Sequence, residues 1–214
     1  VTAVQHPGVM AVIERTAQNR RSPLTIARAD RKTPIPSLPG AHQRENAALA
    51  LETMRRLHSL PFPSEAAAVL AKVQWPGRFE RLETPPLVLD GAHNEHATRV
   101  LASTWKEEFP GRKAALVFAA SADKHIREMI PVLREITGEW HLVPCTSPRI
   151  MPAEEMAALL GEQETGPVFI HSSLLDGLQA ALASPLPVLA AGSLFLLGDL
   201  KALLRHAEKR STAQ

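Results

Sequence analysis

The sequence predicts an α/β fold: a Rossmann-like, mostly parallel sheet with helices on both faces. From about residue 75 onward, short apolar runs alternate with amphipathic helical patterns, which is typical of a parallel sheet covered by helices. The apolar run 87–89 ends in Asp90 and Gly91, a turn of the kind at which such sheets present ligand-binding groups. Hydrophobic residues at 45% and charged residues at 21% are typical of a globular domain.

Within residues 75–214, apolar runs too short for helices predict buried strands. We expect these strands at 87–90, 114–119, 140–143, 167–171 and 186–190. The segments between them carry apolar residues at helical spacing. We therefore expect helices at 94–108, 123–136, 152–161, 174–183 and 194–209. Pro131 predicts an irregularity in the second of these helices, because proline lacks a backbone donor.

The first part of the chain has a different pattern, with more helix and more proline. We expect, in order, a helix, a short strand, a proline-rich break and two further helices, at residues 8–19, 24–27, 33–40, 42–58 and 64 to about 75. We therefore divide the chain into a mainly helical segment, 1–74, and an α/β domain, 75–214.

Composition excludes several classes of function. The formal charge is only +2 and Lys and Arg form no basic block, so we expect no nucleic-acid partner. No apolar stretch is long enough to span a membrane, and no Cys/His cluster has metal-site spacing. Cys145 is the single cysteine, so no internal disulfide can form and we expect a cytoplasmic protein. Because the chain opens on Val1, we interpret it as a piece of a longer protein.

Polar side chains follow the strand predicted at 87–90. Asp90 is placed to hold a ribose or a metal, although an Asp before a helix also serves as a cap. His93, near a helix N-terminus, is suited to bind an anion, and a structural role is the alternative. We expect Asn94 to cap the helix rather than to bind a ligand.

Two further candidates lie on turns. Arg78 follows a Pro-Gly turn, and its guanidinium suits a phosphate, although a surface pair with Glu80 is the alternative. Ser193 leads from a strand into a helix, so it is either a ligand for a carboxylate or phosphate or an N-cap. The chain contains no G-x-x-x-x-G-K-[ST], G-x-S-x-G or G-x-G-x-x-G motif, so it has no phosphate loop of its own.

Six motifs occur in order across residues 38–214. They are Leu38-Pro39-Gly40-Ala41-His42-Gln43-Arg44-Glu45-Asn46-Ala47-Ala48-Leu49-Ala50, Trp75-Pro76-Gly77-Arg78-Phe79-Glu80, Leu89-Asp90-Gly91-Ala92-His93-Asn94, Ser121-Ala122-Asp123-Lys124, Thr146-Ser147-Pro148-Arg149 and Gly192-Ser193-Leu194-Phe195-Leu196-Leu197-Gly198. Together they resemble the signatures of the folylpolyglutamate synthase/dihydrofolate synthase branch of the Mur ligases.

The resemblance implies an ATP-dependent ligase of folate biosynthesis and one-carbon metabolism, which joins L-glutamate to a folate through an acyl phosphate. It implies that residues 75–214 form the C-terminal glutamate-ligase domain and that residues 1–74 are the end of a central ATPase domain. Because the phosphate loop is absent, this piece alone is expected to be inactive, and ligands for Mg²⁺ are expected mainly upstream of it. The partners implied are ATP, glutamate and a folate, bound by a monomer.

The same resemblance assigns roles to individual residues. Asn46, Arg78 and Asp90 would bind ATP, at its adenine, phosphates and ribose respectively. His93 and Ser193 would bind glutamate, and Arg78 and His93 would act in catalysis. No residue of this chain is expected to bind a metal.

The sequence departs from the family pattern at Glu95, where proline is common, and in the segment 24–38, which is short. Two other functions therefore stay open. One is a noncatalytic, Rossmann-like nucleotide-binding module. The other is a Mur-type ligase that uses another acceptor or amino acid.

Overall fold

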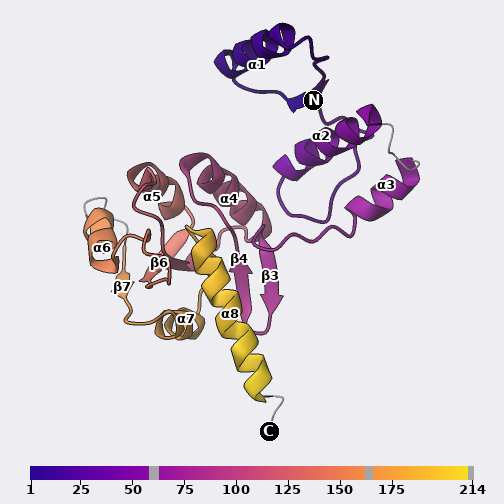
Figure 1. Ribbon diagram of the computed structural model, residues 1–214. Helices are drawn as coiled ribbons and strands as arrows, with labels where there is room; N and C mark the ends of the chain where they lie inside the picture. The colour runs from indigo at the N-terminus through magenta and orange to yellow at the C-terminus, as the bar shows by residue number, and fades with distance from the viewer. Residues whose placement is uncertain (58–62, 162–165, 212–214) are drawn as a thin grey trace. The chain divides into compact units, whose positions relative to one another are not determined.

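The computed structural model describes residues 1–57, 63–161 and 166–211, and its chain divides into two compact units (Figure 1). The first unit is Val1–Gln74 and the second is Trp75–Gln214. Assignment of the first unit to a central ATPase domain stays a prediction.

The second unit is built on a six-stranded sheet with the order β3-β4-β8-β5-β6-β7. Its strands are β3 (Glu80–Glu83), β4 (Pro86–Leu89), β5 (Ala114–Phe118), β6 (Thr137–Leu142), β7 (Val168–Ile170) and β8 (Val188–Ala191). Neighbouring strands are parallel except for the pair β3 and β4. The predicted, mostly parallel sheet is confirmed.

Helices cover both faces of this sheet, as predicted. On one face, helix residues pack around Trp105, Phe118 and Trp140, and on the other around Leu89 and Leu196. The first face is covered by α4 (Glu95–Glu108), α5 (Ile126–Arg134) and α6 (Ala153–Gly161), and the second by α7 (Leu174–Ala183) and α8 (Leu194–Ser211). Burial of these apolar side chains is the main favourable contribution to folding.

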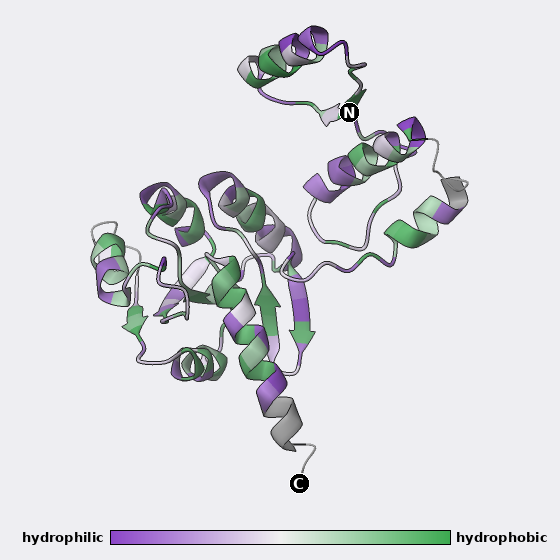
Figure 2. Ribbon diagram, in the orientation of Figure 1, coloured by the Kyte–Doolittle hydropathy of each residue, from purple (hydrophilic) through white to green (hydrophobic). Residues whose placement is uncertain are grey.

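Strand β3 is absent from the sequence prediction. Its residues Glu80, Arg81 and Glu83 are charged, whereas the neighbouring strand β4 is apolar (Figure 2). Strand β3 lies at the edge of the sheet, where charged side chains remain in contact with water and discourage pairing with another chain. An apolar pattern therefore cannot reveal it.

Two elements of the second unit begin three residues away from the predicted position. Helix α5 begins at Ile126 rather than at residue 123, because a turn closed by the Lys124 N–H and the Ser121 carbonyl (3.1 Å) precedes it. Pro131 lies inside this helix. Strand β6 begins at Thr137 rather than at residue 140, since Thr137 already pairs with β5.

The first unit contains a short parallel sheet of β1 (Thr2–Ala3) and β2 (Ile26–Ala27). Its helices are α1 (Pro7–Asn19), α2 (His42–Arg56) and α3 (Pro63–Leu70). Helix α3 is shorter than predicted, and its last carbonyl, that of Leu70, accepts the Ser37 N–H at 3.0 Å. Part of the predicted helix 42–58 lies outside the described residues. Among the helices that the structure describes, none is long and apolar enough to cross a membrane.

The order of the strands creates a switch point at β8. Helix α4 carries the chain from β4 past β8 to β5, and the chain then moves outward through β6 to β7. Helix α7 returns it to β8 over the opposite face. Open α/β sheets bind ligands in the crevice beyond the carboxyl ends of the strands at such a switch point. The fold therefore predicts a ligand-binding site at the loops that follow β4 and β8.

A stack of three rings lies at the other edge of the sheet. The His141 ring, on β6, stacks on Phe169 and His171 with centroid distances of 5.2 Å each. His141 Nδ1 lies 3.0 Å from His171 Nε2, so one of the two nitrogens must be an unprotonated acceptor. His141 Nε2 is buried without a hydrogen-bond partner, and Glu139 Oε2 lies 3.5 Å from it. Burial lowers the pKa of His141, although Glu139 opposes this effect.

This stack predicts a loss of stability in acid. Because the pKa of His141 is lowered from 6.5 on folding, its contribution to stability is present above that pH and is lost as the pH falls. We therefore expect His141 to make the free energy of unfolding lower at pH 5 than at pH 7. Urea unfolding at both pH values measures this loss.

The variant His141→Phe should lose this part of the pH dependence, because its ring stacks without titrating. The control His125→Phe replaces a side chain that is 82% exposed and should keep the wild-type dependence. Identical pH dependence in His141→Phe and the wild type would contradict the prediction.

Candidate functional site

The loops after β4 and β8 are joined by backbone hydrogen bonds. The Asp90 N–H donates to the Ala190 carbonyl (3.0 Å), and the Gly192 N–H donates to the Ala92 carbonyl (2.9 Å). A Cβ atom at Gly91 would lie 2.6 Å from Leu194 Cδ2, so the Leu194 side chain packs closely against this backbone. The two loops therefore form one continuous surface at the switch point.

The Asp90 carboxylate connects this surface to the turn before β3. Its Oδ2 accepts the Phe79 N–H and its Oδ1 accepts the Ala92 N–H, each at 2.9 Å. Burial raises the pKa of Asp90, whereas these two N–H groups and the nearby Arg78 favour the charged form. The cap of helix α4 is instead Asn94, whose Oδ1 accepts the Ala97 N–H at 2.9 Å, as predicted.

Arg78 lies on a turn whose backbone is fixed on both sides. Its N–H donates to the Trp75 carbonyl (3.1 Å), and the next residue, Phe79, has a φ of 46°, a region that few non-glycine residues adopt. Phe79 is only 4% exposed and packs near Trp105, which holds this conformation in place. Backbone conformations of this kind concentrate at functional sites.

The Arg78 side chain is exposed, and its guanidinium has no hydrogen bond or ion pair with any other described residue. The alternative of a pair between Arg78 and Glu80 is wrong, because Glu80 pairs with Lys201. Among the described residues, Arg78 is therefore a cation at the switch point that is available to an anionic ligand.

His93 is half-buried and oriented by its own loop. Its Nδ1 lies 2.7 Å from the Gly91 carbonyl oxygen, which can only accept, so Nδ1 carries the proton of this hydrogen bond. In the neutral ring, Nε2 is then the acceptor and is free to receive a proton or a hydrogen bond from a ligand.

Ser193 lies between β8 and α8. Ser193 is 3% exposed, and its Oγ accepts the Phe195 N–H at 3.1 Å. This is the N-cap contact that was expected as the alternative to ligand binding. The hydroxyl proton remains available as a donor. Gly192, with a φ of 110°, allows the sharp turn at which Ser193 is placed.

Arg78, Asp90, His93 and Ser193 all belong to the second unit, whereas Asn46 belongs to the first. Asn46 is exposed on α2, and its Nδ2 donates to Gln43 Oε1 at 3.0 Å. The structure thus brings the loops of four predicted site residues to one end of one sheet.

Two motifs without a predicted role connect neighbouring segments of the second unit. Arg149 Nη2 lies 2.9 Å from Asp123 Oδ2, which joins the loops after β5 and β6. Asp199, on α8, accepts the Thr146 N–H at 2.7 Å and its hydroxyl at 2.9 Å. No sequence pattern indicates these contacts, because their partners are far apart in the chain.

Other chemistries find little support in the residues that the structure describes. These residues include no group of three His, Cys, Asp or Glu side chains that could hold a metal ion. Burial raises the pKa of Cys145 to about 12, so its thiol stays protonated and is a poor nucleophile at neutral pH.

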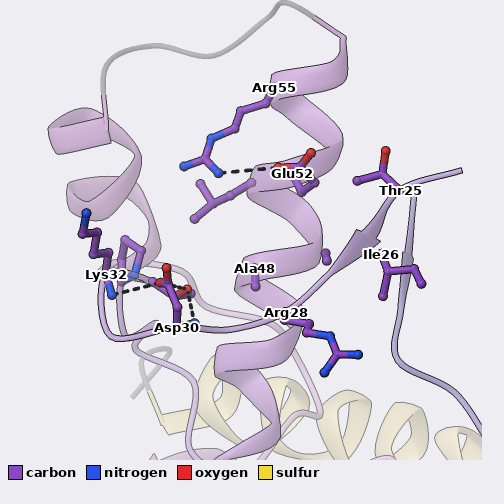
Figure 3. Close-up of a pocket in the computed structure, with 12 residues that line it drawn as sticks. Thr25, Ile26, Arg28, Asp30, Lys32, Ala48, Glu52 and Arg55 are labelled. Carbon is purple, nitrogen blue, oxygen red and sulfur yellow. Dashed lines mark hydrogen bonds and ion pairs between the residues drawn. The ribbon is translucent and has the colours of Figure 1, made fainter. Parts of the chain in front are cut away.

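A pocket of about 530 Å³ lies within the first unit, between β2, the loop after it and α2 (Figure 3). Its acidic groups are already paired: Glu52 with Arg55, and Asp30 with the Thr33 hydroxyl and the Lys32 N–H. None of the predicted site residues lines it.

The mostly parallel sheet, its switch point and the helices on both faces define a Rossmann-like α/β domain. Residues 77–196 match the family of the Mur ligase, glutamate ligase domain. The chain belongs to this family, and the resemblance noted in its sequence is confirmed.

Among its relatives, the chain is 32% identical to the dihydrofolate synthase/folylpolyglutamate synthase of Bacillus subtilis, over 79% of this chain and 40% of the relative. It is 29% identical to the folylpolyglutamate synthase of Lacticaseibacillus casei, over 78% of this chain and 39% of that protein. The chain therefore spans about two fifths of the length of these relatives.

Two solved structures of such synthases are also similar to this chain. The folylpolyglutamate synthase of Mycobacterium tuberculosis complexed with ADP has a TM-score of 0.81 and 25% identity, covering 94% of this chain and 53% of the other. The Yersinia pestis bifunctional folylpolyglutamate synthase/dihydrofolate synthase, complexed with AMPPNP and a Mn ion, has a TM-score of 0.73 and 25% identity, with 91% and 50% covered.

The geometry of Asp90 predicts that its removal destabilises the domain. Asp90→Ala leaves the N–H groups of Phe79 and Ala92, which are both buried residues, without their acceptor. We expect a loss of about 2 kcal/mol in the free energy of unfolding, measured with urea at neutral pH.

Asp123→Ala is the matched control, because the Asp123 side chain is 52% exposed and its pair with Arg149 is screened by solvent. Its loss should be clearly smaller. Equal losses in the two variants would show that the Asp90 hydrogen bonds contribute no more to the free energy of unfolding than the exposed pair of Asp123 with Arg149.

Proposed function

We propose that this chain is the glutamate-ligase part of an ATP-dependent ligase that adds L-glutamate to a folate through an acyl phosphate. Membership of the Mur ligase family and the relatives named above support this choice of reaction. The observation that carries it is the Arg78 guanidinium, which is unpaired among the described residues. It is held on a fixed turn that is bonded to the loop of His93, and this loop is in turn bonded to the loop of Ser193.

In the proposed reaction, a carboxylate oxygen of the folate attacks the terminal phosphorus of ATP and ADP leaves. The amino nitrogen of glutamate then attacks the acyl carbon, phosphate leaves and an amide bond forms. Negative charge builds on the phosphoryl oxygens in the first step and on the acyl oxygen in the second. Fixed donors that face these oxygens lower both barriers, since they need no reorganisation.

On this proposal, Arg78 stabilises the phosphates of ATP. A guanidinium offers two parallel N–H donors to phosphate oxygens, and its charge is permanent at neutral pH. Asp90 has lone pairs left after accepting two N–H groups, so it can also accept a ribose hydroxyl. Asn46, in the first unit, is proposed to contact the adenine.

The incoming glutamate would meet His93 and Ser193. The free Nε2 of His93 is suited to take a proton from the glutamate ammonium, which must become a neutral amine before it attacks. The Ser193 hydroxyl can donate to a glutamate carboxylate while its oxygen caps α8.

A divalent cation, proposed here to be Mg²⁺, would neutralise part of the charge on the phosphates of ATP. The described residues do not supply a set of side chains that fits it, so we derive no step through the metal. We further propose that the protein acts in the cytoplasm as a monomer.

Two alternatives make different demands on the protein. A noncatalytic nucleotide-binding module would bind ATP without consuming it, and a Mur-type ligase with another acceptor would consume ATP without a folate. Assays of the natural full-length protein with dihydropteroate and with a tetrahydrofolate as acceptors separate these cases, because only the proposed function yields a glutamylated folate.

The role of Arg78 predicts a large effect on rate. Arg78→Ala in the full-length protein should lower ATP-dependent incorporation of labelled glutamate about a hundredfold, because one fixed donor to the phosphoryl group is lost. The free energy of unfolding should change little, since the side chain is exposed and unpaired within the described residues.

Arg112→Ala is the control, because Arg112 is also exposed but lies just before β5, at the amino ends of the parallel strands. It should retain a rate near that of the wild type. A wild-type rate in Arg78→Ala would remove Arg78 from the site.

A further inference from the structure

One ion pair connects the turn that carries Arg78 to helix α8. Glu80 Oε2 accepts the Gly77 N–H at 2.7 Å, so the Glu80 carboxylate closes the turn 77–80 on itself. Lys201 Nζ, on α8, lies 2.6 Å from Glu80 Oε2 and 2.8 Å from Oε1. The Glu80 carboxylate thus holds the turn, and Lys201 on α8 holds this carboxylate.

This pair is better shielded than the surface ion pairs of the domain. The side chains of Lys201 and Glu80 are 23% and 25% exposed, whereas those of Arg99 and Glu95 are 63% and 40% exposed. Exposed pairs are screened and contribute little, while partly buried, hydrogen-bonded pairs fix geometry more strongly.

Helix α8 also contacts the turn directly. A Cβ atom at Gly77 would lie 2.8 Å from Leu197 Cδ1, so the helix packs tightly against the turn backbone. Ser193 immediately precedes this helix, and Lys201 lies further along it. A single helix therefore connects the proposed glutamate contact with the turn of Arg78.

We propose that Lys201 is a positioning residue for the ligase reaction: through Glu80, it holds the Arg78 guanidinium in the orientation that meets the ATP phosphates. This inference rests on the proposed role of Arg78. Lys201 itself does not touch a substrate. Its loss leaves Glu80 free to rotate, releases the Gly77 N–H and spreads Arg78 over several orientations.

A double-mutant cycle in the full-length protein tests this inference, with kcat/KM for ATP as the measurement. Lys201→Met keeps the aliphatic stem but removes the charge, and we expect kcat/KM for ATP to fall roughly tenfold. The KM for the folate should stay unchanged. Lys201→Arg keeps the ion pair and should restore most of the loss.

Arg205→Met is the control, because Arg205 is an exposed cation one turn further along α8 and makes no ion pair with a described residue. It should match the wild type. In the Arg78→Ala background, Lys201→Met should cause no further loss, because Lys201 acts only through Arg78.

Equal losses from Lys201→Met in both backgrounds would overturn the inference, since they would indicate a general structural effect. So would wild-type kcat/KM in Lys201→Met beside a large loss in Arg78→Ala, and in that case the proposed function would stand. If Arg78→Ala itself has no effect, the phosphate role of Arg78 fails and the inference falls with it.

Discussion

The site depends on one half-buried carboxylate that accepts two backbone N–H groups. Asp90 joins the turn before β3, at Phe79, to the loop after β4, at Ala92. Without it, two buried N–H donors would lose their acceptor, and the turn that carries Arg78 would lose one of its hydrogen bonds to the loop after β4. The Gly91 N–H, which donates to the Gly77 carbonyl (2.7 Å), forms another. The position of Arg78, which makes no ion pair with a described residue, therefore depends on a residue whose carboxylate oxygens accept backbone N–H groups.

The sheet makes this arrangement possible. Because β8 lies between β4 and β5, the loops that carry Asp90, His93 and Ser193 emerge side by side at one end of parallel strands. Apolar cores on both faces hold these strands rigid, and rigid strands fix the loops at their ends. Helix α8 then adds a second link to the turn, through Glu80 and Lys201. The two links hold Gly77 and Phe79, the residues directly before and after Arg78 in the chain.

The apolar strands and the amphipathic helices were predictable because burial on a parallel sheet leaves a clear hydrophobic pattern. Strand β3 was not, since a charged edge strand has no such pattern. In the site, the capping role of Asn94 follows from local sequence, and the structure agrees. The pair of Glu80 with Lys201 could not be predicted, because the two residues are 121 positions apart and only the fold brings them together. Local sequence instead suggested a pair between Glu80 and Arg78.

A crystal structure of the natural full-length protein, with a nonhydrolysable ATP analogue and glutamate, tests the central claim most directly. The account predicts that the Arg78 guanidinium lies within hydrogen-bond distance of a phosphate oxygen, with glutamate bound beside His93 and Ser193. A nucleotide bound with Arg78 directed into solvent, or glutamate bound away from the loops that follow β4 and β8, would contradict it.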